Sequence, residues 1–145
     1  MTTLKNSVCV KYTPKEMYDL VNDIRAYPVY LPLISEVKMH SETPSSLRAT
    51  LTLSKGRIKF SFTTDNTMQD GREIRMNLVE GPFKSLKAIW TFNTVHGNQC
   101  EATFDIDFEF TNGLMAMAFG GFFKEVTESL VEAFCRQAAL RYGAR

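Results

Sequence analysis

The sequence predicts an α+β fold in which a curved antiparallel sheet of seven strands wraps around one long C-terminal helix. Between Cys100 and Phe110, apolar and polar residues alternate without interruption, which is the period of a half-buried strand. From Leu114 onward, apolar residues recur every three or four positions, which is the period of an amphipathic helix. Short turns join the other alternating segments, so successive strands are expected to be antiparallel neighbours.

The N-terminal segment predicts one strand followed by two short helices. Residues 4–12 alternate as a strand does. Thr13, Pro14 and Glu16 then fit the start of a helix, with a capping hydroxyl, a proline at the first helical position and an acidic residue three positions after the cap. This helix is expected to end near Asn22, and the prolines that follow keep a second helix short.

Five further strands are predicted between the helical segment and the last strand. Glycine-containing turns such as Lys55-Gly56 and Asp70-Gly71 separate them. No linker, repeat or low-complexity segment interrupts the pattern, so residues 1–145 are expected to form a single domain. The strands are predicted at residues 33–41, 47–53, 58–63, 74–78 and 86–92.

The composition indicates a soluble protein. Its formal net charge is +1, which gives no global sign of a nucleic-acid or membrane-surface binder. The three cysteines are far apart and form no metal-ligand or disulfide pattern, which favours a reducing, cytoplasmic setting. Residues 1–5 lack the apolar run of a signal peptide, and no apolar run is long enough to span a membrane, so neither a signal peptide nor a transmembrane segment is expected. With only two histidines, no metal or cofactor is expected.

The predicted sheet is too wide for one helix to cover. Seven strands spaced about 4.8 Å apart make a sheet roughly 30 Å wide, whereas a helix with its side chains is only about 10–12 Å wide. The remaining apolar face must be closed by curvature, by the short helices or by a ligand, so we expect a ligand-binding cavity, with core packing as the alternative for each residue. Its predicted lining is Leu51, Leu53, Phe60, Phe62, Met76, Leu78, Trp90, Phe104, Phe108, Phe119, Phe123 and Val126, with Phe83 at its rim.

Several segments carry a resemblance to a known family. They are Tyr18–Ile24 with Tyr27-Pro28, Asn77–Lys84 with Trp90-Thr91-Phe92, and Asp107–Phe110. In these segments the chain resembles the ubiquinone-binding START branch of the START-like helix-grip superfamily. That branch includes the mitochondrial coenzyme Q-binding proteins and the bacterial ribosome association toxins of the RatA type.

The resemblance implies two non-enzymatic functions. In the first, the cavity binds ubiquinone or a related isoprenoid lipid and the protein supports respiration as a chaperone or carrier. In the second, the protein is a toxin that associates with the large ribosomal subunit and inhibits subunit joining. A polyketide cyclase or dehydratase is a weaker third alternative, because the predicted apolar set contains no general base.

Basic residues at two turns are candidates for contact with RNA phosphate or an anionic lipid headgroup. Lys55, Arg57 and Lys59 lie at one predicted hairpin, and Lys84 and Lys87 lie near another turn. The alternative is that they are solvated turn residues. The expected partners are therefore a hydrophobic small molecule, the large ribosomal subunit and the surface of a membrane.

Overall fold

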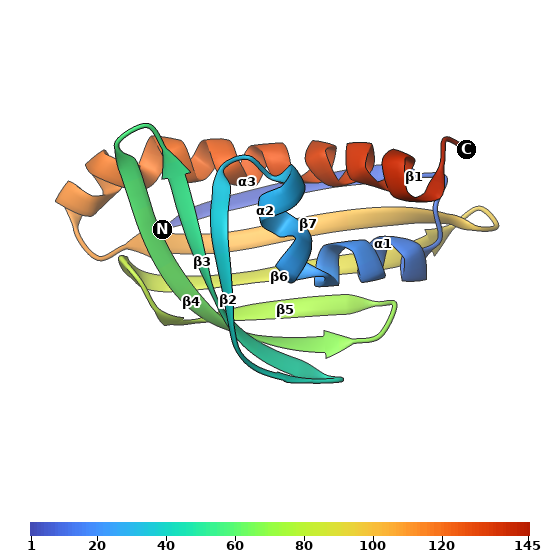
Figure 1. Ribbon diagram of the computed structural model, residues 1–145, viewed down its shortest axis with the longest axis horizontal. Helices are drawn as coiled ribbons and strands as arrows, with labels where there is room; N and C mark the ends of the chain where they lie inside the picture. Colours follow the sequence, from blue (N-terminus) through green and yellow to red (C-terminus); the bar gives the residue numbers. More distant parts are fainter.

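The computed structural model describes all 145 residues and confirms the predicted architecture (Figure 1). One seven-stranded sheet wraps around the C-terminal helix, and the short helices follow the first strand. The elements in chain order are β1 (Thr2–Val10), α1 (Pro14–Asn22), the 3₁₀ helix η1 (Ile24–Ala26), α2 (Tyr27–Tyr30), β2 (Ile34–Thr43), β3 (Ser46–Lys55), β4 (Ile58–Gln69), β5 (Glu73–Glu80), β6 (Phe83–Val95), β7 (Gln99–Phe110) and α3 (Gly113–Tyr142).

The sheet is antiparallel throughout, with the strand order β1-β7-β6-β5-β4-β3-β2. Its ladders shift register between Thr63 and Thr64 in β4 and between Ile34 and Glu36 in β2. Such irregularities bend strands and increase their twist. In Figure 1, β2, β3 and β4 accordingly cross the direction of α3, whereas β6 and β7 run along it. This curvature creates the concave face on which α3 lies.

The turn between β5 and β6 passes very close to β4. A Cβ atom placed on Gly81 would lie 2.6 Å from the Cβ atom of Phe62, and the backbone of Gly81 has a φ of +151°. Only glycine fits this approach without displacing one of the two segments. Gly81 thus fixes the entry of the chain into β6 beside Phe62.

The start of α1 is tied to the end of the chain. The side chains of Thr13 and Glu16 each accept a hydrogen bond from the other residue's backbone N–H, at 3.1 and 3.0 Å, which confirms the predicted cap. The guanidinium group of Arg145 donates to both carboxylate oxygens of Glu16, at 2.5 and 2.7 Å, and lowers the pKa of that carboxyl to about 2. The Tyr142 hydroxyl donates to the backbone carbonyl of Glu16.

The C-terminal helix has a buried part and an exposed beginning. Phe123, Val126 and Phe134 face the sheet and are buried, whereas Leu114 and Met117 are 71% and 84% exposed. None of the helices combines the length and the apolar character that crossing a bilayer requires. The first turns of α3 are therefore exposed, and the helix packs on the core from Phe122 onward.

Strand β4 is longer than the sequence predicts. The expected segment ends at residue 63, whereas β4 continues to Gln69. The alternation of apolar residues stops because Thr64 and Asn66 occupy positions on the inner face, where Phe62 and Met68 also lie. Both polar residues are buried, so they belong to the interior and not to a turn.

Candidate ligand-binding site

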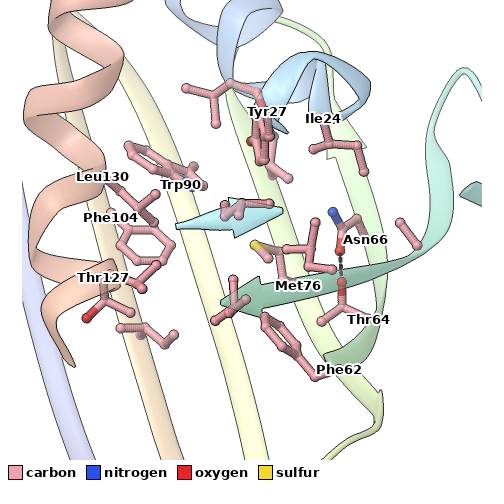
Figure 2. Close-up of a pocket in the computed structure, with 18 of the residues that line it drawn as sticks. Ile24, Tyr27, Phe62, Thr64, Asn66, Met76, Trp90, Phe104, Thr127 and Leu130 are labelled. Carbon is pink, nitrogen blue, oxygen red and sulfur yellow. Dashed lines mark hydrogen bonds between the residues drawn. The ribbon is translucent and has the colours of Figure 1, made fainter. Parts of the chain in front are cut away.

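A cavity lies between the concave face of the sheet and α3, and the segment from α1 to α2 closes it on one side (Figure 2). Its volume is about 70 Å³, and 18 of its 22 lining residues are hydrophobic. Pockets for small ligands commonly measure about 300–1,000 Å³. The cavity is therefore too small for a whole ligand in this structure, and such a ligand fits only if part of the wall moves.

Most of the predicted lining residues surround this cavity. Strands β3 to β7 contribute the majority of them, and α3 contributes the remainder. The eight predicted residues that line the cavity are Leu51, Leu53, Phe62, Met76, Trp90, Phe104, Phe123 and Val126.

Five predicted residues lie outside the lining. The rings of Phe60, Phe83, Phe108 and Phe119 pack together near the beginning of α3, with 4.7 Å between the ring centroids of Phe60 and Phe119. Phe83 is only 5% exposed, so it is a core residue and not part of an open rim. Leu78 is partly buried against the core. Alternation identifies the inner face of a strand but not the position along the sheet, which explains why these residues were grouped with the cavity.

The sequence analysis allowed the short helices to close the apolar face, but it named none of their residues as lining. Val21, Ile24 and Tyr27 line the cavity from α1, η1 and α2, and Leu130 and Phe134 line it from α3. The helical period of α3 places Leu130 and Phe134 on the same apolar face as Phe123 and Val126, so the sequence could have identified these two residues as lining. No local pattern identified which residues of the irregular segment after α1 face the cavity.

Four of the lining residues are polar, and none of them is ionisable. The Thr64 hydroxyl donates to the side-chain oxygen of Asn66 at 2.8 Å, and the Thr127 hydroxyl donates to the backbone carbonyl of Lys124 at 2.9 Å. The side-chain oxygen of Asn22 is buried without a partner. These groups are too few and too weakly acidic or basic to transfer protons, but they can orient a ligand.

Tyr27 is the sole ionisable residue in the lining. Its hydroxyl donates to the backbone carbonyl of Val21, and burial raises the pKa of Tyr27 well above the ordinary value. The phenol is therefore neutral near pH 7, and its proton is already used in a hydrogen bond. It packs edge to face against Tyr30 and tilted against Phe134, which gives it a structural role in the wall.

The predicted basic residues are partly neutralised by neighbours. Lys55 donates to both carboxylate oxygens of Glu125 on α3, at 2.8 and 2.9 Å. Lys84 lies 3.5 Å from Glu109, and Lys87 stands opposite Asp107 in the β6–β7 ladder. Arg57 and Lys59 form no ion pair. Lys87 likewise forms no ion pair, so the free cations of the predicted set are Arg57 and Lys59 at the β3–β4 hairpin and Lys87 on β6.

The exposed beginning of α3 is a second surface feature. No charged residue occurs between Thr111 and Phe123, and Leu114 and Met117 are among the most exposed apolar side chains of the protein. The paired Lys55 and Glu125 place the basic hairpin beside the next turns of the same helix. An exposed apolar segment next to cations is typical of an interaction surface.

A sheet wrapped around a long helix, with an apolar cavity between them, defines a helix-grip protein of the START type. Residues 10–135 match the family described as polyketide cyclase / dehydrase and lipid transport. Over 145 residues the chain is 39% identical to the ribosome association toxin RatA of Escherichia coli (strain K12), covering all of this chain and 92% of that protein. The chain therefore belongs to the polyketide cyclase / dehydrase and lipid transport family, in the branch of the RatA proteins, as the sequence resemblance predicts.

Other comparisons extend the relationship in two directions. A mitochondrial coenzyme Q-binding protein of Xenopus laevis is 26% identical over 136 residues, covering 91% of this chain and 56% of that protein. A START superfamily protein of Mycobacterium smegmatis has a TM-score of 0.75 at 20% identity, covering 95% and 97% of the two chains. The Zhui aromatase/cyclase of Streptomyces sp. R1128 has a TM-score of 0.84 at 13% identity over 99% of both chains, which shows the shared fold alone.

Proposed function

We propose that this protein acts by binding and not by catalysis, and that its cavity holds ubiquinone or a related isoprenoid lipid. The observation that carries the proposal is the lining, in which 18 of 22 residues are hydrophobic and none is charged. Removal of apolar surface from water contributes roughly 25 cal/mol per Å², so an isoprenoid chain supplies the binding energy without strong polar contacts. The coenzyme Q-binding relative from Xenopus laevis supports this ligand class.

The non-catalytic part of the proposal rests on the chemistry of the lining. General acid–base catalysis needs a group that exchanges a proton near the working pH, and Tyr27 is neutral and hydrogen-bonded. Structural neighbours of the cyclase type share this fold, but fold alone does not transfer a reaction. The RatA relatives are named for association and toxicity.

Ligand entry is proposed to require movement of the segment from η1 to α2. This segment consists of a three-residue 3₁₀ helix and a four-residue α-helix, which have few internal hydrogen bonds to break. The hydroxyl of Tyr30 is buried there without a partner, and Val29 is 85% exposed. Weakly bonded elements of this kind open more readily than the strands around them.

Gentle purification from the native host, followed by organic extraction and mass spectrometry, tests the ligand proposal. We expect a quinone or another isoprenoid lipid to copurify in stoichiometric amount. A protein with a known bound lipid, purified in parallel, controls for losses during preparation. An empty extract from this protein, alongside a retained lipid in the control, would contradict the proposal.

A second function, association with the large ribosomal subunit, is favoured by the RatA relatives. The 39% identity is measured over all 145 residues of this chain. We propose that the protein is a cytoplasmic toxin that hinders subunit joining and that its contact with ribosomal RNA includes Arg57 and Lys59. The alternative to RNA contact at this surface is peripheral contact with an anionic membrane. The same cations would then meet lipid headgroups, and the exposed apolar beginning of α3 would meet the bilayer.

Charge reversal at the hairpin tests the ribosome proposal. Arg57→Glu/Lys59→Glu is expected to abolish cosedimentation with large subunits, and rising salt should weaken the binding of the wild type. The variant leaves the ion pair of Lys55 with Glu125 intact. Lys11→Glu/Lys38→Glu, at exposed positions, makes the same change in net charge and should retain binding. Loss of binding in both variants would show a dependence on net charge alone.

A further inference from the structure

Two polar residues stand in the apolar interior at the middle of β4. Thr64 and Asn66 are 3% and 4% exposed, and both line the cavity. The neighbouring inward positions on the same strand are Phe62 and Met68. A strand whose inner face is otherwise apolar has no packing reason for two consecutive polar residues there, and such local inconsistencies commonly mark functional positions.

The hydrogen bonds of this pair leave donors unused. The Thr64 hydroxyl donates to the side-chain oxygen of Asn66 at 2.8 Å, so the oxygen end of the amide is occupied. The Asn66 Nδ2 group, with its two N–H donors, makes no hydrogen bond within the protein. Figure 2 shows this nitrogen pointing away from Thr64, toward the residues that line the cavity. Because this nitrogen is not among the fully buried atoms that lack a partner, it is open to the cavity, where a ligand or a water molecule can accept its hydrogen bonds.

One fully buried polar atom without a partner also lies in the lining. The buried Oδ1 atom of Asn22, at the end of α1, has no hydrogen-bond partner. Asn22 and Asn66 thus approach the cavity from the helical wall and from the sheet, respectively. The Asn66 donor suits a carbonyl oxygen on a bound molecule, whereas the Asn22 oxygen can only accept and would need a hydroxyl or N–H group. Both groups favour a molecule with a polar end over a hydrocarbon chain alone.

We propose that the cavity takes its ligand polar end first and that the Asn66 amide donates to a carbonyl oxygen on that end. This inference rests on the proposed lipid-binding function and adds the orientation of the ligand and the residue that selects it. The Thr64 hydroxyl holds the amide with its nitrogen toward the ligand, so Thr64 is a positioning residue. The apolar tail then follows along the remaining hydrophobic lining.

Trp90 provides the means to test this orientation. It is the single tryptophan of the chain and it lines the cavity, so a bound quinone should quench its fluorescence. Decylubiquinone is the probe with a carbonyl-bearing head, and decylbenzene, which has the same tail and a ring without oxygen, is the matched competitor. The test variant Thr64→Val/Asn66→Leu replaces both polar partners by apolar groups of similar shape.

We expect the double variant to bind decylubiquinone about 3- to 10-fold more weakly than the wild type, the range for the loss of one net hydrogen bond. Displacement by decylbenzene should be unchanged or stronger. The Tm should not fall, because replacing both partners of a buried hydrogen bond removes the unused donor with it. Asn77→Leu, at an exposed position on the adjacent strand β5, is the control and should bind both probes as the wild type does.

Each contrary outcome has a distinct meaning. Equal affinity of the double variant and the wild type for decylubiquinone would overturn the role of Asn66 while leaving the proposed cavity in place. A lower Tm with unchanged affinity would show that Thr64 and Asn66 are a structural pair, which also overturns the inference. Failure of decylubiquinone to quench Trp90 in the wild type would overturn both this inference and the proposed quinone binding.

Discussion

Phe134→Ala is expected to lower the free energy of unfolding by about 3–5 kcal/mol, the cost of truncating a fully buried aromatic residue. Phe134 is 1% exposed. The centroid of its ring lies 5.5 Å from that of Tyr27 and 5.4 Å from that of Trp90. Its truncation removes the aromatic contacts of α3 with Tyr27 of the short helices and with Trp90 of the sheet. Thermal denaturation should show a fall in Tm of roughly 10–15 °C for a domain of this size.

Phe119→Ala is the matched control for this truncation. Phe119 lies on the same helix but is only partly buried, and its one close aromatic neighbour is Phe60. We expect a loss of about 1–2 kcal/mol, because fewer contacts are removed and solvent fills the space. Equal losses at the two positions would contradict the conclusion that α3 is packed more tightly at Phe134 than at Phe119.

The elements with an unbroken local period could be predicted almost to the residue. The alternation from Cys100 to Phe110 corresponds to β7 (Gln99–Phe110), and the cap at Thr13 begins α1 as expected. Both signals are local, because alternation and capping depend on residues within one element. The antiparallel order followed from the short turns, and the structure confirms it.

The lining of the cavity could be predicted only in part, because it depends on how the sheet bends. Phe60 and Phe62 share one face of β4, yet Phe62 lines the cavity and Phe60 joins the aromatic cluster near the beginning of α3. The register shift between Thr63 and Thr64 lies just beyond Phe62, the last of these two residues before the strand changes its course. A bend of this kind arises from the whole sheet, and no short window of sequence specifies it.

The two proposed functions use different parts of one hairpin. Leu51 and Leu53 of β3 line the cavity, whereas Arg57 and Lys59 are exposed near the tip. A substitution at the tip leaves the lining untouched, and a substitution in the lining leaves the free cations in place. The lipid and ribosome proposals can therefore be tested separately in the same protein, and a variant that loses both activities would have to act through the fold.

Ala49→Leu is expected to fill the cavity and to reduce decylubiquinone binding at least tenfold while the protein remains folded. Ala49 is 2% exposed and lines the cavity from β3. The three added carbon atoms enter a space of about 70 Å³, and each buried methylene contributes about 0.8 kcal/mol, offset by any strain from overpacking. The Tm should thus be unchanged or higher, as measured by thermal denaturation beside the Trp90 quenching titration.

Ala139→Leu adds the same group at an exposed position on α3 and should alter neither the quenching nor the Tm. Cosedimentation of Ala49→Leu with large ribosomal subunits should also match the wild type, because Arg57 and Lys59 are unchanged. A folded Ala49→Leu protein that still bound decylubiquinone with wild-type affinity would place the ligand elsewhere. Loss of ribosome binding in that variant, without loss of stability, would instead show that the state of the cavity governs the surface of the hairpin, since Ala49 and the two cations lie on one pair of strands.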